Sequence, residues 1–249
     1  MTVRLVVLGC LCGALGLNFA ACREERIASD LTVDQLREAG LRKLEAEDEP
    51  AARAYFEHMI TRSATAAPEA LYYVALSYYQ QELYEEAYVR FDQIIDRYPA
   101  SEWCDDAQYM KGEARLAGAL PLEKDQTAVD QALEEFTILL EEYEDSPLVP
   151  EAQEGIARAR ALKAAKLLQI GKFYKKTREW RAGAVYFENL AADYPEFEGL
   201  AEVYFLAGEC YRELGEPEPA SRHYRTVLSR YPDSPYAAAA AGRLAAWEG

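Results

Sequence analysis

Residues 70–99 read ALYYVALSYYQQELYEEAYVRFDQIIDRYP, and three spacings in this stretch recur along the chain. The small residue Ala75 precedes a second small residue, Ala87, by 12 positions. The aromatic Phe91 follows Ala87 after four positions, and Pro99 follows Phe91 after eight. Small residues let two helices approach closely and an aromatic ring fills the groove between them, while proline ends a helix because it lacks the backbone N–H. The stretch therefore predicts a pair of antiparallel helices.

The combination of a small residue and an aromatic residue four positions later occurs five times. The five pairs are Ala52/Phe56, Ala87/Phe91, Ala132/Phe136, Gly183/Phe187 and Ala220/Tyr224. Successive aromatic residues are 35, 45, 51 and 37 positions apart. The second interval contains an inserted loop over 119–127. The third contains extra residues over 150–166, which we interpret as an extension of the first helix of the fourth pair.

This periodicity resembles the tetratricopeptide repeat, a helix–turn–helix unit of about 34 residues. We therefore expect an all-α fold, a right-handed α-solenoid of five tetratricopeptide repeats with a C-terminal capping helix over 234–249. Five unrelated hairpins in one bundle are the alternative, but they would not share one register. The predicted divisions are a removed signal peptide (1–21), a short lipid-anchored linker (22–31), repeats one to three (32–146), and the elongated helix with repeats four and five and the capping helix (147–249).

The first residues have the pattern of a secretory signal. Arg4 precedes an apolar run over 5–17, and two alanines stand directly before Cys22. The cysteine resembles that of a bacterial lipoprotein signal, although Phe19 stands where leucine is usual. This resemblance implies that Cys22 is acylated, becomes the new N-terminus and anchors the chain through covalent lipid. An ordinary cleaved signal is the alternative.

Composition excludes several function classes. The chain has 43 acidic against 27 basic residues, a net charge of -16, which argues against nucleic acid as a partner. It lacks a glycine-rich phosphate loop, a nucleophile elbow and metal-ligand spacings, so we expect no enzyme, no metal and no cofactor beyond the lipid. We expect His58 and His223 on the surface. Cys104 and Cys210 should be buried free thiols, because repeats touch only their neighbours.

In repeats of this kind the first helix of each pair lines the concave face. Tyrosines at such positions offer apolar area with a hydrogen-bonding tip, which suits an extended peptide. The predicted peptide groove consists of Arg37, Leu41, Tyr72, Leu76, Tyr79, Tyr109 and Glu113. The alternative is that these aromatic residues pack on the neighbouring repeat.

Charge is segregated in the second half of the chain. Nine basic residues lie between Arg158 and Arg181, opposed only by Glu179, whereas residues 133–154 hold eight acidic residues and no basic one. Neutralisation by adjacent helices, docking of an acidic partner and contact with an anionic membrane surface are three explanations that the sequence leaves open. The predicted docking residues are Lys172, Lys175, Lys176, Arg178 and Arg181.

The order of these features resembles one family of lipoproteins. A lipoprotein signal precedes five repeats, with a long loop in the third and an elongated helix entering the fourth. Local stretches agree: Tyr109-Met110-Lys111-Gly112, Asp125-Gln126-Thr127-Ala128, and Phe173-Tyr174-Lys175-Lys176 followed by Trp180. Together they resemble the outer-membrane assembly lipoprotein family that includes BamD and ComL. The acidic total charge, and Glu144 where the pattern would place proline, are departures.

The resemblance implies a non-enzymatic subunit of the β-barrel assembly machinery, anchored at the periplasmic face of the outer membrane. Its C-terminal repeats would hold the POTRA region of the barrel subunit, alongside other assembly-machine subunits. Its N-terminal repeats would receive C-terminal segments of unfolded outer-membrane proteins. A periplasmic lipid-anchored repeat scaffold for cell-wall or secretion assemblies is the alternative function.

Overall fold

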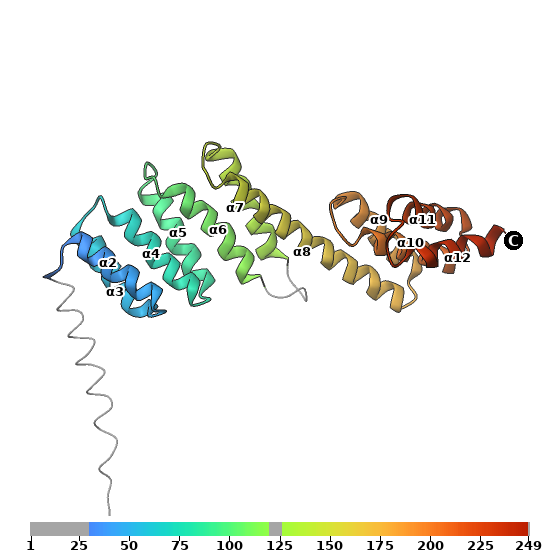
Figure 1. Cartoon of the computed structure of the whole chain (residues 1–249), viewed down its shortest axis with the longest axis horizontal. Coiled ribbons are helices and arrows are strands. Elements are labelled where there is room, and N and C mark those ends of the chain that lie inside the picture. Colours follow the sequence, from blue (N-terminus) through green and yellow to red (C-terminus); the bar gives the residue numbers. More distant parts are fainter. Residues whose placement is uncertain (1–29, 120–125, 249) are drawn as a thin grey trace, which may run out of the picture. The chain divides into compact units, whose positions relative to one another are not determined.

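The computed structural model describes residues 30–119 and 126–248, and within these ranges the chain forms eleven helices and no strand (Figure 1). The helices are α2 (Val33–Glu45), α3 (Glu49–Arg62), α4 (Ala67–Gln80), α5 (Tyr84–Arg97), α6 (Cys104–Gly118), α7 (Thr127–Glu142), α8 (Val149–Lys176), α9 (Trp180–Asp193), α10 (Leu200–Glu213), α11 (Pro217–Arg230) and α12 (Ala237–Glu248). The predicted all-α class is confirmed. None of the helices in these ranges is both long and apolar enough to cross a membrane.

Consecutive helices form five hairpins, α2/α3 to α10/α11, followed by the single helix α12. This is the tetratricopeptide architecture that the sequence predicts. The extra residues of the fourth repeat belong to α8, which is 28 residues long. The predicted signal peptide (1–21), Cys22, most of the linker and most of the inserted loop lie outside the described residues.

The chain divides into two compact units. The first comprises residues up to Gly118 together with 135–152, and the second comprises 119–134 together with 153–249. In the first unit α3 packs on α4, and α5 packs on α6. In the second unit α10 packs on both α9 and α11, and α12 packs on α11. Consecutive helices are therefore neighbours in space, as the repeat pattern requires.

Each hairpin is centred on the aromatic residue of its second helix. Phe56, Phe91, Phe136, Phe187 and Tyr224 are all fully buried. Gly40 faces Phe56 so closely that an added Cβ would lie 2.6 Å from the ring. The small residue that lies 12 positions before Ala52 therefore contacts the aromatic ring of the second helix directly.

The two histidine side chains are less exposed than the sequence predicts. His58 is half-buried, but the prediction that His223 lies on the surface is wrong, because this side chain is buried. His223 stacks on Tyr211 with ring centroids 5.6 Å apart, and its Nε2 lies 3.1 Å from Glu188 Oε1. Burial lowers the pKa of His223. The prediction that Cys104 and Cys210 are buried free thiols is confirmed.

Four of the hairpin turns repeat one backbone arrangement. The second residue after the first helix has a positive φ, and the N–H of the next residue bonds back to the carbonyl five residues earlier, as in a Schellman motif. The positive-φ residues are Glu47 (56°), Glu82 (60°), Arg178 (66°) and Gly215 (72°). The bonds run from Asp48 N to Lys43 O, Leu83 N to Tyr78 O, Glu179 N to Tyr174 O and Glu216 N to Tyr211 O, each at 2.9 to 3.0 Å. Of these four turns, only that of the fifth repeat has glycine, the residue that adopts this conformation without steric cost.

Exchanging residues at this turn position should therefore shift stability in opposite directions. We predict that Glu82→Gly raises the free energy of unfolding by about 0.5–1 kcal/mol, because it relieves a left-handed conformation. Gly215→Ala should lower it by about 1 kcal/mol, because nothing but the backbone angle opposes the new methyl group. Urea denaturation of the two variants measures both changes. Equal signs for the two substitutions would contradict this explanation of the turn.

Candidate functional site

The first unit has a surface groove of about 910 Å³ at the beginnings of its first helices. The start of α2 contributes Val33 and Arg37, and the start of α4 contributes Pro68 and Glu69. The links between α3 and α4 and between α5 and α6 complete the wall. They supply Ser63, Ala64, Thr65, Ala66, Tyr98, Pro99, Ala100, Ser101, Glu102 and Trp103, and Arg97 comes from the end of α5. Prolines and aromatic rings beside hydroxyl and charged groups suit an extended peptide.

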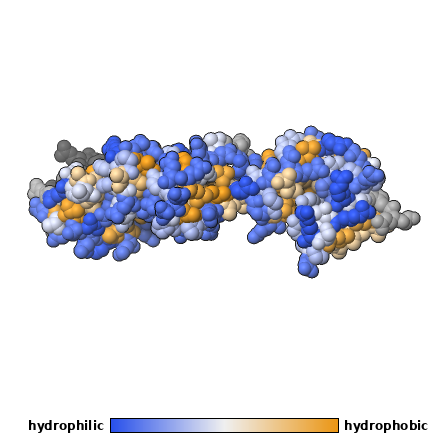
Figure 2. Space-filling model, turned by 90° about the horizontal axis from the view of Figure 1, so that it is seen from above, coloured by the Kyte–Doolittle hydropathy of each residue, from blue (hydrophilic) through white to orange (hydrophobic). Residues whose placement is uncertain are grey.

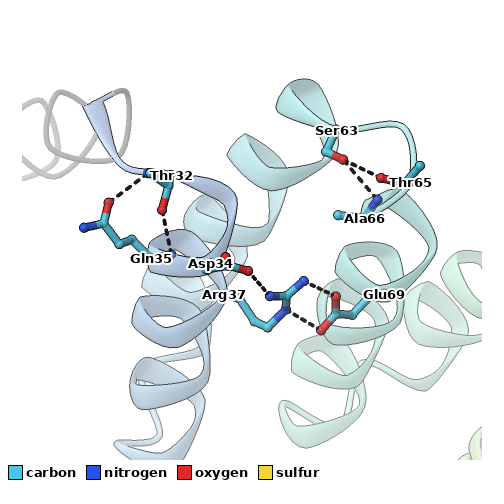
Figure 3. Close-up of polar contacts among 8 residues, drawn as sticks. All are labelled: Thr32, Asp34, Gln35, Arg37, Ser63, Thr65, Ala66 and Glu69. Atoms are coloured by element: carbon cyan, nitrogen blue, oxygen red, sulfur yellow. Dashed lines mark hydrogen bonds and ion pairs between the residues drawn. The ribbon is translucent and has the colours of Figure 1, made fainter.

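Arg37 joins the first two repeats at this groove (Figure 3). Its Nε and Nη2 donate to the two carboxylate oxygens of Glu69 at 2.7 and 2.8 Å, and its Nη1 donates to Asp34. These partners raise the pKa of Arg37. A bidentate pair of this kind fixes the orientation of both side chains. Arg37 therefore shapes the groove and holds α2 against α4.

Local capping interactions order the edge of the groove. Thr32 Oγ1 accepts from Gln35 N at 3.3 Å, while Gln35 Oε1 accepts from Thr32 N at 2.9 Å, which is a capping box at the start of α2. Ser63 Oγ accepts from Ala66 N at 3.2 Å just before α4. Both sets of contacts are visible in Figure 3. The groove edges are thus held by hydrogen bonds within the linking segments.

Of the seven residues predicted to form a peptide groove, only Arg37 lines this one. Leu41 and Leu76 pack against the buried clusters of the first repeats. Tyr72 packs on Phe91 and Trp103, with ring centroids 5.5 and 5.0 Å apart, and burial raises its pKa to about 12.

The remaining three residues are half-buried elsewhere in the first unit. Tyr79 lies edge-on to Tyr84, and Tyr109 lies 5.9 Å from the ring of Phe136. Glu113 lies on α6 and is also half-buried. The contacts of the predicted aromatic and aliphatic groove residues therefore correspond to the alternative, in which these side chains pack within and between repeats.

Sequence reasoning did not select Trp103, Tyr98 and Pro99 as groove residues. In the repeat pattern Pro99 indicates only the end of a helix. Trp103 comes from the link between α5 and α6, outside the repeating positions, and its ring lies 5.8 Å from Tyr73. Its only signal in the sequence is a tryptophan four positions after the helix-ending Pro99.

The second unit has an apolar pocket of about 590 Å³ at the turn between α8 and α9. It is lined by Arg178, Glu179, Trp180, Arg181, Ala182, Val185, Tyr186 and Leu214. Val185 is 43 % exposed at the pocket, and Phe173 nearby in sequence on α8 is 59 % exposed. Tyr186 stacks on Tyr174 with centroids 5.2 Å apart. Figure 2 shows that such apolar patches interrupt a largely hydrophilic surface.

The basic residues of this region fall into two groups. Several are neutralised within the second unit: Arg160 by Glu196, Lys163 by Asp130, Lys172 by Glu202 and Arg181 by Glu216. Most of these carboxylates come from later repeats rather than from the acidic segment over 133–154. For Lys175, Lys176 and Arg178, the structure records no ion pair with any described residue. Charge neutralisation therefore accounts for part of the basic segment, and a basic cluster remains at the turn.

Within the described ranges, no group of three or more His, Cys, Asp or Glu side chains is placed to hold a metal ion. A polar cluster around Lys111 in the first unit joins side chains of neighbouring helices. Lys111 Nζ lies 2.7 Å from Asp92 and 3.2 Å from Glu135, and the Tyr88 hydroxyl donates to Glu135 at 2.6 Å. Repeated hairpins of this kind define a protein of the tetratricopeptide class.

Residues 29–225, more than half of the chain, match the family model of YfiO, an outer membrane lipoprotein. The chain belongs to this family, which confirms the resemblance to the BamD- and ComL-like lipoproteins. The absence of an enzymatic role is consistent with this membership, because its curated members are named assembly factors.

Curated relatives carry the name outer membrane protein assembly factor BamD. The relative from Neisseria meningitidis serogroup A is 20 % identical over 242 residues, covering 90 % of this chain and 91 % of the relative. The Caulobacter vibrioides relative is 24 % identical over 156 residues, covering 63 % and 51 %. The Haemophilus influenzae relative is 26 % identical over 147 residues, covering 55 % and 56 %.

Solved structures with similar hairpins include the complex of the TPR2AB domain of yeast Sti1 with pHSP90. Its TM-score is 0.45 at 15 % identity, covering 81 % of this chain and 78 % of that one. A thermophilic tetratricopeptide protein of Thermus thermophilus has a TM-score of 0.36 at 19 % identity, covering 86 % and 99 %.

Proposed function

We propose that this protein is a non-enzymatic, lipid-anchored subunit of the outer-membrane β-barrel assembly machinery. Membership of the YfiO family over residues 29–225 carries the proposal. The BamD relatives are named as assembly factors of outer membrane proteins, and the same role is proposed for this chain. Acylation of Cys22 would retain the protein at the periplasmic face of the outer membrane.

Docking on the POTRA region of the barrel subunit is assigned to the turn between α8 and α9. The pocket around Trp180 and Val185 supplies apolar area, while Lys175, Lys176 and Arg178 provide positive charge beside it. Interfaces of this kind derive most of their affinity from an anchor in a desolvated pocket, and the charged rim sets orientation and association rate. The other two predicted docking residues are Lys172 and Arg181. They are already paired with Glu202 and Glu216, respectively, and would contribute to the interface from these ion pairs.

Reception of unfolded outer-membrane proteins is assigned to the groove of the first unit. Its Pro68, Pro99, Tyr98 and Trp103 offer flat apolar surfaces to an extended chain. Ser63, Thr65 and Ser101 add hydroxyl groups that can hydrogen-bond a peptide backbone. An extended peptide with aromatic side chains, such as the C-terminal segment of a barrel protein, fits this chemistry.

The docking assignment predicts the effect of a charge placed in the apolar pocket. We expect Val185→Glu to abolish stoichiometric recovery of a POTRA-bearing barrel protein when the tagged chain is purified from native membranes in mild detergent. The new side chain would replace apolar contact area with a carboxylate that loses its hydration when the interface forms, which costs several kcal/mol. Val89→Glu is the matched control, because Val89 occupies the same register position on α5 and is 50 % exposed. This control should leave recovery unchanged.

Two further variants separate charge from shape at the same surface. The double substitution Lys175→Glu/Lys176→Glu reverses the charge and should reduce recovery of the barrel protein. The double substitution Lys175→Arg/Lys176→Arg keeps the charge and should retain recovery. Unchanged thermal unfolding of all variants confirms intact folds. Recovery of cell-wall or secretion components in place of the barrel protein would refute the assembly role and favour the scaffold alternative.

The groove assignment predicts that a bulky side chain on its wall weakens peptide binding. We expect Ala100→Arg to weaken binding of a synthetic C-terminal peptide from an outer-membrane barrel protein by about tenfold, about 1.4 kcal/mol. Fluorescence anisotropy on the full chain measures this change. Ala54→Arg, at an exposed position on α3 away from the groove, adds the same side chain and should leave affinity unchanged. Equal affinities for the two variants would place the peptide elsewhere.

A further inference from the structure

An arginine of this chain occupies the link between the fourth and fifth repeats. The guanidinium of Arg160, on α8, lies over the ring of Tyr194 at the start of the link between α9 and α10, 5.0 Å from the ring centroid. Its Nε donates to Glu196 Oε1 at 2.6 Å, and its Nη2 donates to the carbonyl oxygen of Asp193 at 2.7 Å. The hydrogen bond from Arg160 lowers the pKa of Glu196. A ring, a carboxylate and a carbonyl therefore form an arginine site at this link.

The link between α11 and α12 has the same backbone geometry. Tyr231 follows α11 as Tyr194 follows α9, with φ and ψ of -134° and 51° against -130° and 63°. Within the links, Phe197 N donates to Tyr194 O and Ser234 N donates to Tyr231 O, both at 3.1 Å. Proline comes directly after the tyrosine in both sequences. The side chains of the two links therefore start from equivalent positions.

The groups that bind Arg160 have counterparts in the second link. Asp233 stands two positions after Tyr231, as Glu196 does after Tyr194, and Asp233 is exposed. Among the described residues, however, no cation pairs with Asp233 or lies on the Tyr231 ring. The second link thus has the ring and the carboxylate of an arginine site without an arginine from this part of the chain.

The lengths of the first helices explain this difference. The helix α8 has 28 residues and carries Arg160 at 11 positions before Gly171, the glycine of its hairpin. The helix α10 has 14 residues and begins at Leu200, only eight positions before the corresponding Gly208. The fifth repeat therefore has no helical extension that could place a side chain on the link after it.

The second link lines an open pocket of about 480 Å³. Tyr231 and Tyr236 contribute aromatic rings, and Pro232 and Pro235 contribute apolar surface. The ring of Tyr231 stacks on Tyr204 with centroids 6.1 Å apart, which leaves its other face for a ligand.

The charged residues that line this pocket are mostly acidic. They are Glu198, Glu202, Asp233 and Arg230. Glu202 pairs with Lys172 at 2.8 Å, so Glu198 and Asp233 are the carboxylates that remain for an incoming cation. This charge, together with the aromatic rings, suits a guanidinium group, which both stacks on rings and pairs with carboxylates.

We propose that the link between α11 and α12 binds an arginine side chain carried by another protein. The guanidinium would lie on Tyr231 and pair with Asp233, in the arrangement that Arg160 adopts one repeat earlier. Lysine would fit less well, because an ammonium group cannot form the planar, paired hydrogen bonds of a guanidinium. The net charge of -16 disfavours a second copy of this chain as the source, because two such copies repel each other.

This inference goes beyond the proposed function, since the link lies apart from the Trp180 pocket and from the groove of the first unit. The proposals can fail independently. Recovery of a POTRA-bearing barrel protein tests the Trp180 pocket, whereas arginine binding tests the link.

The test uses the segment that fills the equivalent site in this chain. A fluorescein-labelled synthetic peptide with the sequence of residues 154–166, which includes Arg160, is the probe. A second peptide has citrulline in place of that arginine, which keeps the shape of the side chain and removes its charge. Fluorescence anisotropy measures binding of both peptides to the full chain in mild detergent. We expect the arginine peptide to bind about tenfold more tightly, because only a charged guanidinium gains from the carboxylate.

Substitutions in the chain locate the binding site. Asp233→Asn should weaken binding of the arginine peptide by about tenfold and leave binding of the citrulline peptide unchanged, because both changes remove the same ion pair. Asp145→Asn is the matched control. Asp145 has the same position in the link after α7, is exposed and lines neither this pocket nor the groove of the first unit. This control should leave both affinities unchanged, and equal thermal unfolding midpoints confirm intact folds.

Three results would overturn the proposal. The first is equal affinity of the two peptides for the unsubstituted chain. The second is an equal effect of Asp233→Asn and Asp145→Asn, which would show that the peptide responds to total charge only. The third is self-association of the full chain in sedimentation velocity that Asp233→Asn abolishes, because the site would then hold a second copy of this chain.

Discussion

The structure depends on aromatic rings that rest directly on glycines of the partner helix. A Cβ added to Gly112 would lie 2.5 Å from the ring of Phe136, and one added to Gly171 would lie 2.5 Å from Phe187. Real Cβ atoms are not found at such distances, so these contacts define how closely the two helices of a hairpin approach. The second repeat has Ala75 at the corresponding position, with Phe91 fully buried against its cluster. The spacing between helices is thus adjusted locally in each repeat.

This close approach determines where functional groups are placed. Once a ring is seated, the turn between the two helices has one geometry, and four turns share it. Residues at the turn and on the outward face of the second helix then stand at repeated positions. One such position holds Glu188 against the next repeat, while another leaves Val185 open beside Trp180. Interior repeats use such positions to hold their successors, as Glu188 does when it accepts from the Tyr211 hydroxyl.

The fold could be predicted because its determinants are periodic. The spacing between Ala87 and Phe91 occurs five times, and the aromatic residue of each pair is fully buried in its hairpin. The candidate sites could be predicted only in part. Counting along a helix gives the direction of Tyr72 but not the position of Trp103, which covers it from a link outside the repeat pattern.

The charges and the histidines show the same limit. The acidic segment over 133–154 is adjacent in sequence to the basic one, yet Glu196, Glu202 and Glu216 from later repeats neutralise most of the paired residues. His223 is polar and lies on a second helix, but Tyr211 and Glu188 of neighbouring helices bury it. Contacts between repeats depend on three-dimensional neighbours that a single repeat does not specify.

The most direct test of the account compares two glycine-to-alanine substitutions by urea denaturation. Gly171→Ala should lower the free energy of unfolding by about 1–3 kcal/mol, because the methyl group would overlap the ring of Phe187. Gly242→Ala, in α12 with no atom within 4 Å, should raise it by about 0.5–1 kcal/mol through helix propensity alone. A Gly171→Ala variant as stable as the unsubstituted protein would contradict the claim that ring-on-glycine contacts determine the hairpin geometry.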